Sequence, residues 1–466
     1  MTLNTSDIEQ FTSIVGADYV YLSAHDKFQR YTHDETEDLI FEPSIVLLPK
    51  DVHQISAILK YCNEAKIPVT TRGAGTGLSG GALASEGGVL LSTERLNNII
   101  EIDDRNGYVI TEPAVITEVL QETLKQRGWF YPPDPASKGS CFIGGNVAEN
   151  SGGPKAVKYG VVKDYVLNLE IVLPDGAIVW TGANVIKNAT GYNLTQLIVG
   201  SEGTLAVITK IVLKIIPHPR FDVLLLAPFQ SATDACAAVA SVFSAGITPS
   251  AMEFMERNAI EWAMEFTGST MALPDSVQAH LLIELDGNDL DILMDEAEQV
   301  ATELEKHHCG DLLFADSAQQ KSELWKLRRS VAEAVKANSV YKEEDTVVPR
   351  AHLPELLQTV KHIGLKYGFQ SVCYGHAGDG NLHVNIIKGN LSDQIWHDTL
   401  PKAISELFTE VVRLGGTLSG EHGIGLVQKN YMPIALNPVQ LSLMKKIKRT
   451  FDPNNILNPN KIFPDL

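Results

Sequence analysis

Residues 72–81 of the chain read RGAGTGLSGG and directly follow the strand-like segment IPVTT at 67–71. Glycine lacks a Cβ atom, so a run this rich in glycine lets backbone N–H groups approach a bound anion closely. We therefore expect this loop to cradle a phosphate group. Gly75, Gly77 and Gly80 also satisfy G-x-G-x-x-G, the fingerprint with which a Rossmann domain binds a dinucleotide such as NAD.

The sequence after the loop disfavours the NAD interpretation. A true fingerprint opens a helix directly, and an acidic residue follows about 20 residues later at the end of the next strand. Here the chain continues as GALASEGGVLLS (81–92) into a strand-like run, with no helical pattern between. A plain flexible loop is the other alternative to a phosphate site.

Two further glycine-rich blocks lie in the same half of the chain. They are GGNVAENSGGPKAVKYG at 144–160 and GSEGTLAVIT at 200–209, and the segment PPDP stands at 132–135. One glycine-rich loop is common, whereas three within one domain indicate a long nucleotide that crosses several loops in turn.

Three segments carry a family resemblance: RGAGTGLSGG, CFIGGNVAENSGGPKAVKYG (141–160) and VGSEGTLAVIT (199–209). They resemble the FAD domain of the vanillyl-alcohol-oxidase/PCMH flavoprotein superfamily. Nearly the whole chain is similar to the branch that contains glycolate oxidase D-subunits, D-lactate dehydrogenases and D-2-hydroxyglutarate dehydrogenases. The resemblance implies FAD, with its pyrophosphate on residues 72–81 and its flavin near Pro133, Gly145, Asn150 and Ser151.

The full set of FAD contacts that the resemblance implies spans all of these loops. It comprises Arg72, Gly73, Ala74, Gly75, Thr76, Gly77, Ser79, Gly80, Pro133, Asp134, Gly144, Gly145, Asn146, Asn150, Ser151, Gly153, Tyr159, Gly160, Glu202, Gly203, Ile208 and Asn458. Some relatives tether FAD covalently through a histidine or a cysteine. Loop 72–81 contains neither, and Cys141 looks like an ordinary small residue in this branch, so non-covalent FAD is expected.

Short β-rich segments alternate with helix-like ones from about residue 40 to residue 216, and prolines at 217 and 219 predict a boundary. Beyond it, strand-like DVLLLAPF (222–229) and HLLIELDG (280–287) are separated by helix-like segments. With the resemblance, the expected fold is α+β. It comprises a PCMH-type FAD-binding domain of two α/β subdomains at 1–218 and an α+β cap domain with an antiparallel sheet at 219–415. A mostly helical C-terminal segment at 416–466 returns to the FAD domain and completes the active site.

Composition excludes several classes of partner. The chain has 38 lysines and arginines against 57 aspartates and glutamates, a net charge of −19, so neither nucleic acid nor anionic lipid is expected. Its five cysteines lack C-x-x-C spacing, which argues against a disulfide framework, a zinc ribbon and an iron–sulfur cluster. The start MTLNTSDIEQF lacks the pattern of a signal peptide, and no run reaches the ~18 apolar residues of a membrane span. A cytoplasmic protein is expected.

A pair of histidines flanks a predicted hairpin turn in SVCYGHAGDGNLHVNII (371–387). If Asp379-Gly380 forms a two-residue turn, His376 lies directly opposite His383, with Cβ atoms ~4.5–5.5 Å apart, so both imidazoles can meet one metal ion. Two ordinary sheet histidines are the alternative. The nearby motif SGEHGIG (419–425) adds Glu421 as a third candidate ligand, because His₂-carboxylate is a recognised catalytic metal set.

The resemblance extends to both of these motifs. It implies that His376, His383 and Glu421 hold a divalent metal, Zn²⁺ or Mn²⁺, and that His422 is the catalytic base. Arg328 in ELWKLRRS and Arg350 in DTVVPR could each clamp a carboxylate, and the family pattern favours Arg328. Arg329 is expected to be a solvated helix charge.

The expected activity is FAD-dependent oxidation of a D-2-hydroxy acid to the 2-oxo acid, with hydride transfer to flavin N5. D-lactate is favoured over D-2-hydroxyglutarate and glycolate. The alternatives are an NAD-linked oxidoreductase and an FAD-binding subunit of a glycolate-oxidase-like complex that is active only with an iron–sulfur partner. Electrons are expected to leave to a separate acceptor, a quinone, an electron-transfer protein or an iron–sulfur subunit. The sequence leaves the oligomeric state open, a homodimer being the candidate.

Overall fold

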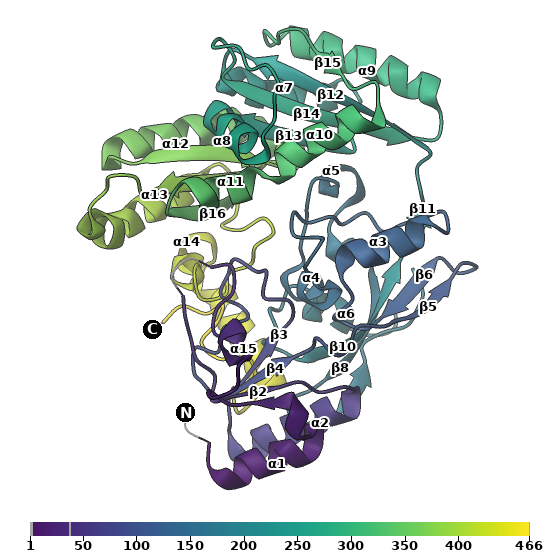
Figure 1. Ribbon diagram of the computed structural model, residues 1–466, viewed down its shortest axis with the longest axis vertical. Helices are drawn as coiled ribbons and strands as arrows, with labels where there is room; N and C mark the ends of the chain where they lie inside the picture. The colour runs from purple at the N-terminus through teal and green to yellow at the C-terminus, as the bar shows by residue number, and fades with distance from the viewer. Residues whose placement is uncertain (1–2, 37–38, 466) are drawn as a thin grey trace. The chain divides into compact units, whose positions relative to one another are not determined.

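A computed structural model describes residues 3–36 and 39–465, which form two compact units. The first unit consists of Met1–Ser151, Val161–His218 and Glu421–Leu466, and the second of Gly152–Gly160 and Pro219–Gly420 (Figure 1). The chain passes between the units at His218, as well as at both ends of the short segment 152–160 and after Gly420. Met1 and Thr2, which belong to the N-terminal segment where no signal peptide was expected, lie outside the described residues.

Among its described residues, the first unit contains a four-stranded sheet, a five-stranded sheet and a two-stranded pair. The four-stranded sheet has the order β1-β2-β4-β3, with parallel pairing of β2 and β3 to β4, and the five-stranded antiparallel sheet has the order β5-β6-β10-β8-β9. Their strands are β1 (Val20–Tyr21), β2 (Ile45–Leu47), β3 (Val69–Arg72), β4 (Val89–Ser92), β5 (Ile99–Asp103), β6 (Tyr108–Thr111), β8 (Val166–Val172), β9 (Ile178–Trp180) and β10 (Val207–Lys214). A further pair joins β7 (Trp129–Phe130) to β11 (Ile216–Pro217).

Helices pack on these sheets through apolar stripes. In α2 the buried positions Ile55, Ile58, Leu59 and Cys62 recur at helical spacing, and the Asp51 side chain caps the first turn. The helices of this unit are α1 (Thr5–Val15), α2 (Val52–Ala65), α3 (Thr117–Lys125), α4 (Ile143–Glu149), α6 (Leu194–Ile198), α14 (Met432–Ala435) and α15 (Pro438–Phe451). The helix expected at the C-terminus forms as α15, and the Pro/Asn-rich end that follows it, residues 452–465, forms turns.

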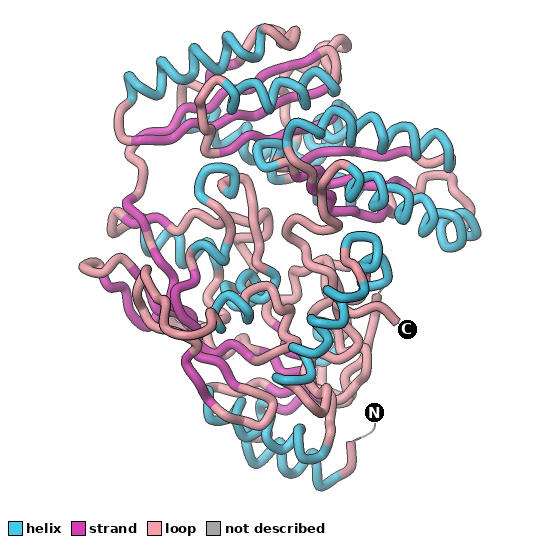
Figure 2. Tube along the Cα trace, turned by 180° about the vertical axis from the view of Figure 1, so that it is seen from behind, coloured by secondary structure: helices cyan, strands magenta, loops and turns pink. Residues whose placement is uncertain are grey.

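The second unit is built on one seven-stranded sheet with the order β15-β12-β14-β13-β17-β18-β16, antiparallel throughout, which confirms the expected antiparallel cap sheet. Strands and helices lie in layers in this unit (Figure 2). Its strands are β12 (Phe221–Phe229), β13 (Ala251–Glu256), β14 (Ala279–Gly287), β15 (Leu313–Phe314), β16 (Tyr341–Val347), β17 (Gln370–Gly375) and β18 (Asn381–Ile387).

Three helices cover the sheet face on which the candidate site lies. Met255 and Leu282 of the sheet pack in one cluster with Ile260 of α8, Leu327 of α10 and Val331 of α11. The helices of the unit are α5 (Ala156–Tyr159), α7 (Ala232–Ser244), α8 (Arg257–Thr267), α9 (Leu290–Glu305), α10 (Ala318–Arg329), α11 (Val331–Asn338), α12 (Leu353–Tyr367) and α13 (Leu400–Arg413). Among the described residues of the whole chain, no helix combines the length and the apolar character that crossing a bilayer requires.

Candidate functional site

The glycine-rich loop of the first unit begins where β3 ends. Residues 73–88 contain no helix before β4 starts at Val89, as the sequence predicted. Arg72 is buried, and burial lowers the pKa of its guanidinium. Its Nη2 donates to the carbonyl of Arg30 at 3.2 Å, but its Nη1 has no hydrogen-bond partner among the described residues. A buried cation with an unused donor fits a phosphate ligand.

Backbone at two predicted cofactor loops is open to a ligand. A Cβ atom placed on Gly77 or on Gly145 would meet nothing within 4 Å, whereas one on Gly73 would lie 3.9 Å from the backbone of Gly145. The first loop therefore runs beside the start of α4, and both expose glycine backbone. Together with Arg72, these residues fit a nucleotide that crosses several loops.

Other predicted cofactor residues make structural contacts within the protein. The side-chain amide of Asn146 donates to Thr117 Oγ1 at 2.7 Å, and Asn150 adopts a left-handed φ of 56° while its Oδ1 accepts the N–H of Lys163. A Cβ on Gly144 would lie 2.5 Å from Pro113, so this glycine permits close packing. The carbonyl of Pro133 accepts Gln121 Nε2 at 2.9 Å.

Three predicted cofactor residues, Gly153, Tyr159 and Gly160, belong to the second unit. There the hydroxyl of Tyr159 donates to Asp286 Oδ1 at 2.8 Å, and Lys158 Nζ lies 2.7 Å from the same atom. Contacts of this kind attach segment 152–160 to β14.

Glu202 and Asn458 hold the first unit's loops together. The Glu202 carboxylate accepts the N–H groups of Ile424 at 2.9 Å and Gly425 at 2.7 Å, and Asn458 Nδ2 donates to the Glu202 carbonyl at 2.6 Å. Lys461 is buried beside them and donates to the carbonyls of Gly81 and Leu83 and to Asn458 Oδ1.

Two charged residues of this cluster were not predicted as site residues. Burial lowers the pKa of Lys461 to about 7, and burial together with the nearby Glu202 charge raises the pKa of Glu149 well above its usual value. The signals were present in the sequence, because Glu149 stands within the second glycine block and Lys461 within the C-terminal NPNK.

The histidine hairpin of the second unit forms, but its predicted register is wrong. Tyr374, not His376, lies opposite His383, and the strands are joined by a wider turn in which Ala377–Asp379 is a 3₁₀ segment. A type I′ turn needs positive φ at both central residues. Here Gly380 has a φ of 89°, but Asp379 remains in the 3₁₀ turn.

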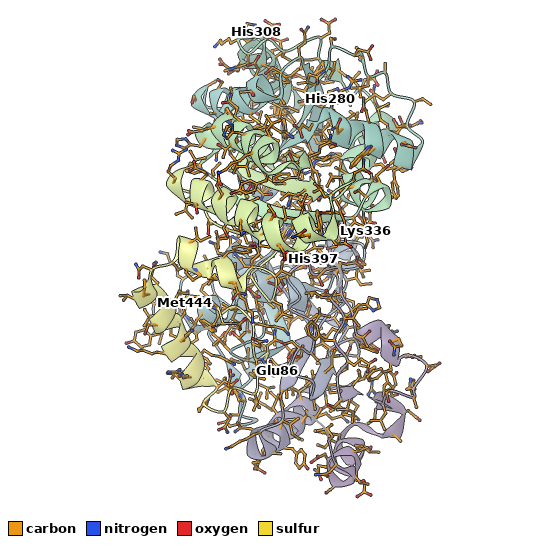
Figure 3. The ribbon with its side chains drawn as sticks, turned by 90° about the vertical axis from the view of Figure 1, so that its left-hand side faces the viewer. Glu86, His280, His308, Lys336, His397 and Met444 are labelled. Atoms are coloured by element: carbon orange, nitrogen blue, oxygen red, sulfur yellow. The ribbon has the colours of Figure 1, made fainter. Side chains whose placement is uncertain are left out.

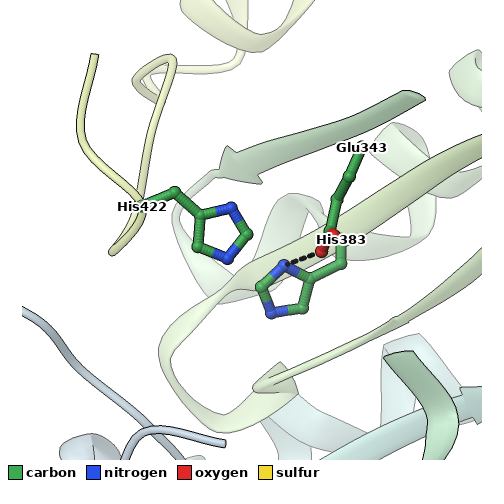
Figure 4. Close-up of side chains that lie close together, drawn as sticks. All are labelled: Glu343, His383 and His422. Carbon is green, nitrogen blue, oxygen red and sulfur yellow. Dashed lines mark ion pairs between the residues drawn. The ribbon is translucent and has the colours of Figure 1, made fainter. Parts of the chain in front are cut away.

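His376 and His383 nevertheless come together. Their ring centroids lie 5.5 Å apart with the planes at 83°. Nδ1 of His376 is 2.9 Å from both carboxylate oxygens of Glu253, and Nδ1 of His383 is 3.1 Å from Glu343 Oε1 (Figure 4). Two imidazoles that share one tetrahedral Zn²⁺ through Nε2 would have centroids about 5 Å apart. The pair therefore fits a divalent cation.

Arg328 of α10 reaches the same sheet face. Its Nη2 lies 2.6 Å from Glu253 Oε2, its guanidinium stands 5.3 Å from the ring centroid of Tyr374, and its buried Nε has no hydrogen-bond partner among the described residues. Arg350, the alternative, stacks over Phe243 at 3.7 Å. Arg329 is not the solvated charge that was predicted, because it is half-buried over the ring of Trp325.

Glu421 and His422 are the first residues of the chain's return to the first unit. The preceding Gly420 is fixed in the second unit, where its N–H donates to Asp345 Oδ2 at 2.8 Å. The following Gly423 belongs to the first unit, where a Cβ on it would lie 3.2 Å from Glu202 Oε1. Both candidate residues thus stand between anchored neighbours.

Sequence reasoning missed Glu253, the residue that contacts both His376 and Arg328. Its signal is a charged residue within the apolar strand segment AMEFME (251–256), where every position up to Met255 is buried. A buried acid in such a strand requires a partner.

Comparisons with known proteins place the chain in a family. Residues 218–462 match the FAD linked oxidases, C-terminal domain, and residues 43–182 match the FAD binding domain. The chain is 37% identical to a D-lactate dehydrogenase of Anaerostipes hadrus, covering 93% of this chain and 92% of that protein. It is 36% identical to glycolate oxidase subunit GlcD of Bacillus subtilis, with coverage of 93% and 92%.

A third relative is D-2-hydroxyglutarate dehydrogenase of Stutzerimonas stutzeri, 31% identical and covering 98% of each chain. Among solved structures, p-cresol methylhydroxylase with substrate bound superposes with a TM-score of 0.80 at 18% identity, covering 99% of this chain and 96% of that one. This likeness confirms the expected PCMH-type α+β fold. The chain belongs to the FAD linked oxidases and is an FAD-binding oxidoreductase.

Proposed function

We propose that the protein oxidises a D-2-hydroxy acid to the 2-oxo acid, with D-lactate the favoured substrate and D-2-hydroxyglutarate and glycolate the alternatives. The observation that carries the proposal is the His376–His383 pair, whose Nδ1 atoms each face a carboxylate. Each Nε2 would then keep the lone pair that a shared cation requires. The names of the relatives, D-lactate dehydrogenase, glycolate oxidase subunit and D-2-hydroxyglutarate dehydrogenase, support the substrate class.

His376, His383 and Glu421 would hold the divalent metal, Zn²⁺ or Mn²⁺. The position of Gly420, the residue before Glu421, supports Glu421 as the third ligand. Asp345 Oδ1 lies 3.8 Å from His383 Nδ1, and the other oxygen of Asp345 binds the N–H of Gly420. Glu421 follows Gly420 directly, and successive Cα atoms are ~3.8 Å apart, so its side chain can reach the histidines.

The chain's own residues would bind and deprotonate the substrate. Arg328 offers a buried guanidinium whose free Nε can pair with the substrate carboxylate. His422 would take the hydroxyl proton, since a histidine titrates near neutral pH. When bound, FAD supplies the acceptor for the C2 hydride and the divalent ion polarises the substrate hydroxyl. Loss of that proton and that hydride leaves the 2-oxo acid.

An FAD-binding subunit that works only with an iron–sulfur partner is the second candidate. The 36% identity to a protein named as a glycolate oxidase subunit favours it. In both cases the electrons pass on to a separate acceptor. Reduction of the flavin by a 2-hydroxy acid in the isolated chain would exclude a requirement for the partner in the first half-reaction.

The test is an anaerobic screen of D- and L-2-hydroxy acids against the isolated protein, with and without Zn²⁺ or Mn²⁺. Bleaching of the flavin by D-lactate but not L-lactate is expected, and metal should accelerate it. Absence of bleaching by every acid would contradict the proposal. The metal is tested separately with His376→Ala, because a variant that keeps full metal content and full turnover would exclude this site.

A further inference from the structure

Glu253 stands at the centre of the polar residues on the second unit's sheet. Its side chain is 0% exposed. Both carboxylate oxygens lie 2.9 Å from Nδ1 of His376, and Oε2 also lies 2.6 Å from Nη2 of Arg328. One buried carboxylate thus joins the two residues that would bind the metal and the substrate carboxylate.

A buried carboxylate is costly unless it is paired, and here both partners are functional candidates. The Arg328 guanidinium, whose Nη2 lies 2.6 Å from Oε2, pairs this carboxylate. The ionised carboxylate accepts the proton of His376 Nδ1. That proton fixes the tautomer, so only Nε2 carries a lone pair for a metal ion.

The strand pairing explains how Glu253 reaches both partners. Met255 pairs with Tyr374, and Tyr374 pairs with His383, so these residues share one face of the sheet. Glu253 lies two residues before Met255 and shares that face. Arg328 comes from α10, which covers the same face.

We propose that Glu253 is the positioning residue of this site: it orients His376 so that Nε2 faces the divalent cation, and it holds the Arg328 guanidinium in place for the substrate carboxylate. This inference rests on the proposed function. Glu253 acts through its two partners and touches neither substrate nor metal itself.

The role of Glu253 in metal binding is tested by titrating Zn²⁺ or Mn²⁺ alone into the metal-free wild type and into metal-free Glu253→Gln. Glutamine keeps the size of the side chain but accepts the His376 proton more weakly. Loss of a carboxylate partner behind a metal-binding histidine weakens metal affinity roughly 10- to 100-fold, and that is the expected loss. Excess metal should then restore part of the variant's activity.

Glu284→Gln is the matched control. Glu284 is a buried glutamate on the neighbouring strand β14, where it pairs with Lys155 and accepts the indole N–H of Trp325, which also belongs to α10, at 2.9 Å. This variant loses a buried ion pair as well, but metal affinity should stay at the wild-type value. If Glu253→Gln acted only by loosening the sheet, Glu253→Gln and Glu284→Gln would lose metal affinity alike.

The double variant Glu253→Gln/Arg328→Gln guards against misfolding, because it leaves no buried arginine without its partner. Its metal affinity should match that of Glu253→Gln. The role of Glu253 in holding Arg328 for the substrate is tested by the kinetics of Glu253→Gln at saturating metal. There kcat should return toward the wild-type value, while KM for D-lactate should stay raised.

Wild-type metal affinity in Glu253→Gln would overturn the inference and leave the proposed function standing. Failure of the wild type to bind either metal would overturn the metal site and this inference with it. Metal binding that depends on His376 and Glu253 in a protein whose flavin no hydroxy acid reduces would support the inference and contradict the proposed substrate.

Discussion

Glu202 Oε2 accepts the backbone N–H of Gly425 at 2.7 Å, while Oε1 accepts the N–H of Ile424 at 2.9 Å. A buried glutamate thereby fixes the turn that follows His422. Leu426 N–H adds a bond to the carbonyl of Ser79, in the glycine-rich loop. The SGEHGIG and GSEGT motifs, more than 200 residues apart, are therefore parts of one structure.

Replacing Glu202 with glutamine should loosen this turn, because an amide nitrogen then faces a backbone N–H. Loss of a hydrogen bond to a charged group costs about 1.5–3 kcal/mol. We expect a lower thermal unfolding midpoint and slower flavin reduction by substrate, measured per bound FAD. Glu170→Gln is the control, since Glu170 is buried in the same unit and pairs with Lys210 at 3.0 Å. Equal reduction rates in wild type and Glu202→Gln would disprove a role in holding His422.

Gly380→Ala should destabilise the histidine hairpin. Gly380 has a φ of 89°, and a Cβ placed on it would lie 1.9 Å from the carbonyl oxygen of Val348. The backbone of the variant must therefore shift. Both the strain of an alanine at positive φ and the clash with the Val348 carbonyl destabilise the native turn. Gly368→Ala is the matched control, because its φ is 80° but its Cβ would meet nothing within 4 Å. Chemical denaturation should show a larger loss of stability for Gly380→Ala, and equal losses would contradict this account.

Arg328→Met should raise KM for the 2-hydroxy acid roughly 10- to 100-fold, the range expected for losing a charge-assisted hydrogen bond. Arg350→Met distinguishes the two candidate clamps. Arg350 is stacked over Phe243, so its loss should leave KM close to the wild-type value. Steady-state kinetics of both variants decide the question, and a larger effect at Arg350 would transfer the role to that residue.

His280 should make the second unit less stable in acid. This histidine, labelled in Figure 3, belongs to β14, and burial lowers its pKa to about 4 from the ordinary 6.5. Between these two values the unfolded chain binds the proton and the folded chain does not, so stability falls as the pH drops through this window. From pH 7.5 to pH 5 the expected loss is about 2 kcal/mol.

His280→Leu removes that titration. Urea unfolding of wild type and variant at pH 7.5 and pH 5 checks the prediction, because only the wild type should lose the extra stability. An equal loss in both proteins would show that other groups account for the acid sensitivity.

The elements with a strong periodic pattern could be predicted from the sequence. Helix α2 repeats apolar residues at helical spacing. The apolar run at 222–229, predicted to be a strand, forms most of β12. Asn460 has a φ of 65°, in the left-handed region that asparagine tolerates better than most residues.

The contacts of individual polar residues could not be predicted, because they depend on pairings far apart in the chain. Glu253 and His376 are 123 residues apart in sequence and meet only when β13 pairs with β17. The two histidines were predicted as a pair from a wrong register. They still meet because the turn between them is short and the hairpin is local, so a shift of two residues keeps their rings within reach.

The most direct test of the central claim is the anaerobic rate of flavin reduction by D-lactate in wild type and in His422→Asn. A base that takes the hydroxyl proton contributes typically 10²- to 10⁴-fold to the rate. We predict reduction in the wild type and a loss of at least roughly 100-fold in the variant, with FAD and metal content unchanged. Equal rates in the two proteins would contradict the role of His422, and an unreduced wild-type flavin would contradict hydroxy-acid oxidation itself.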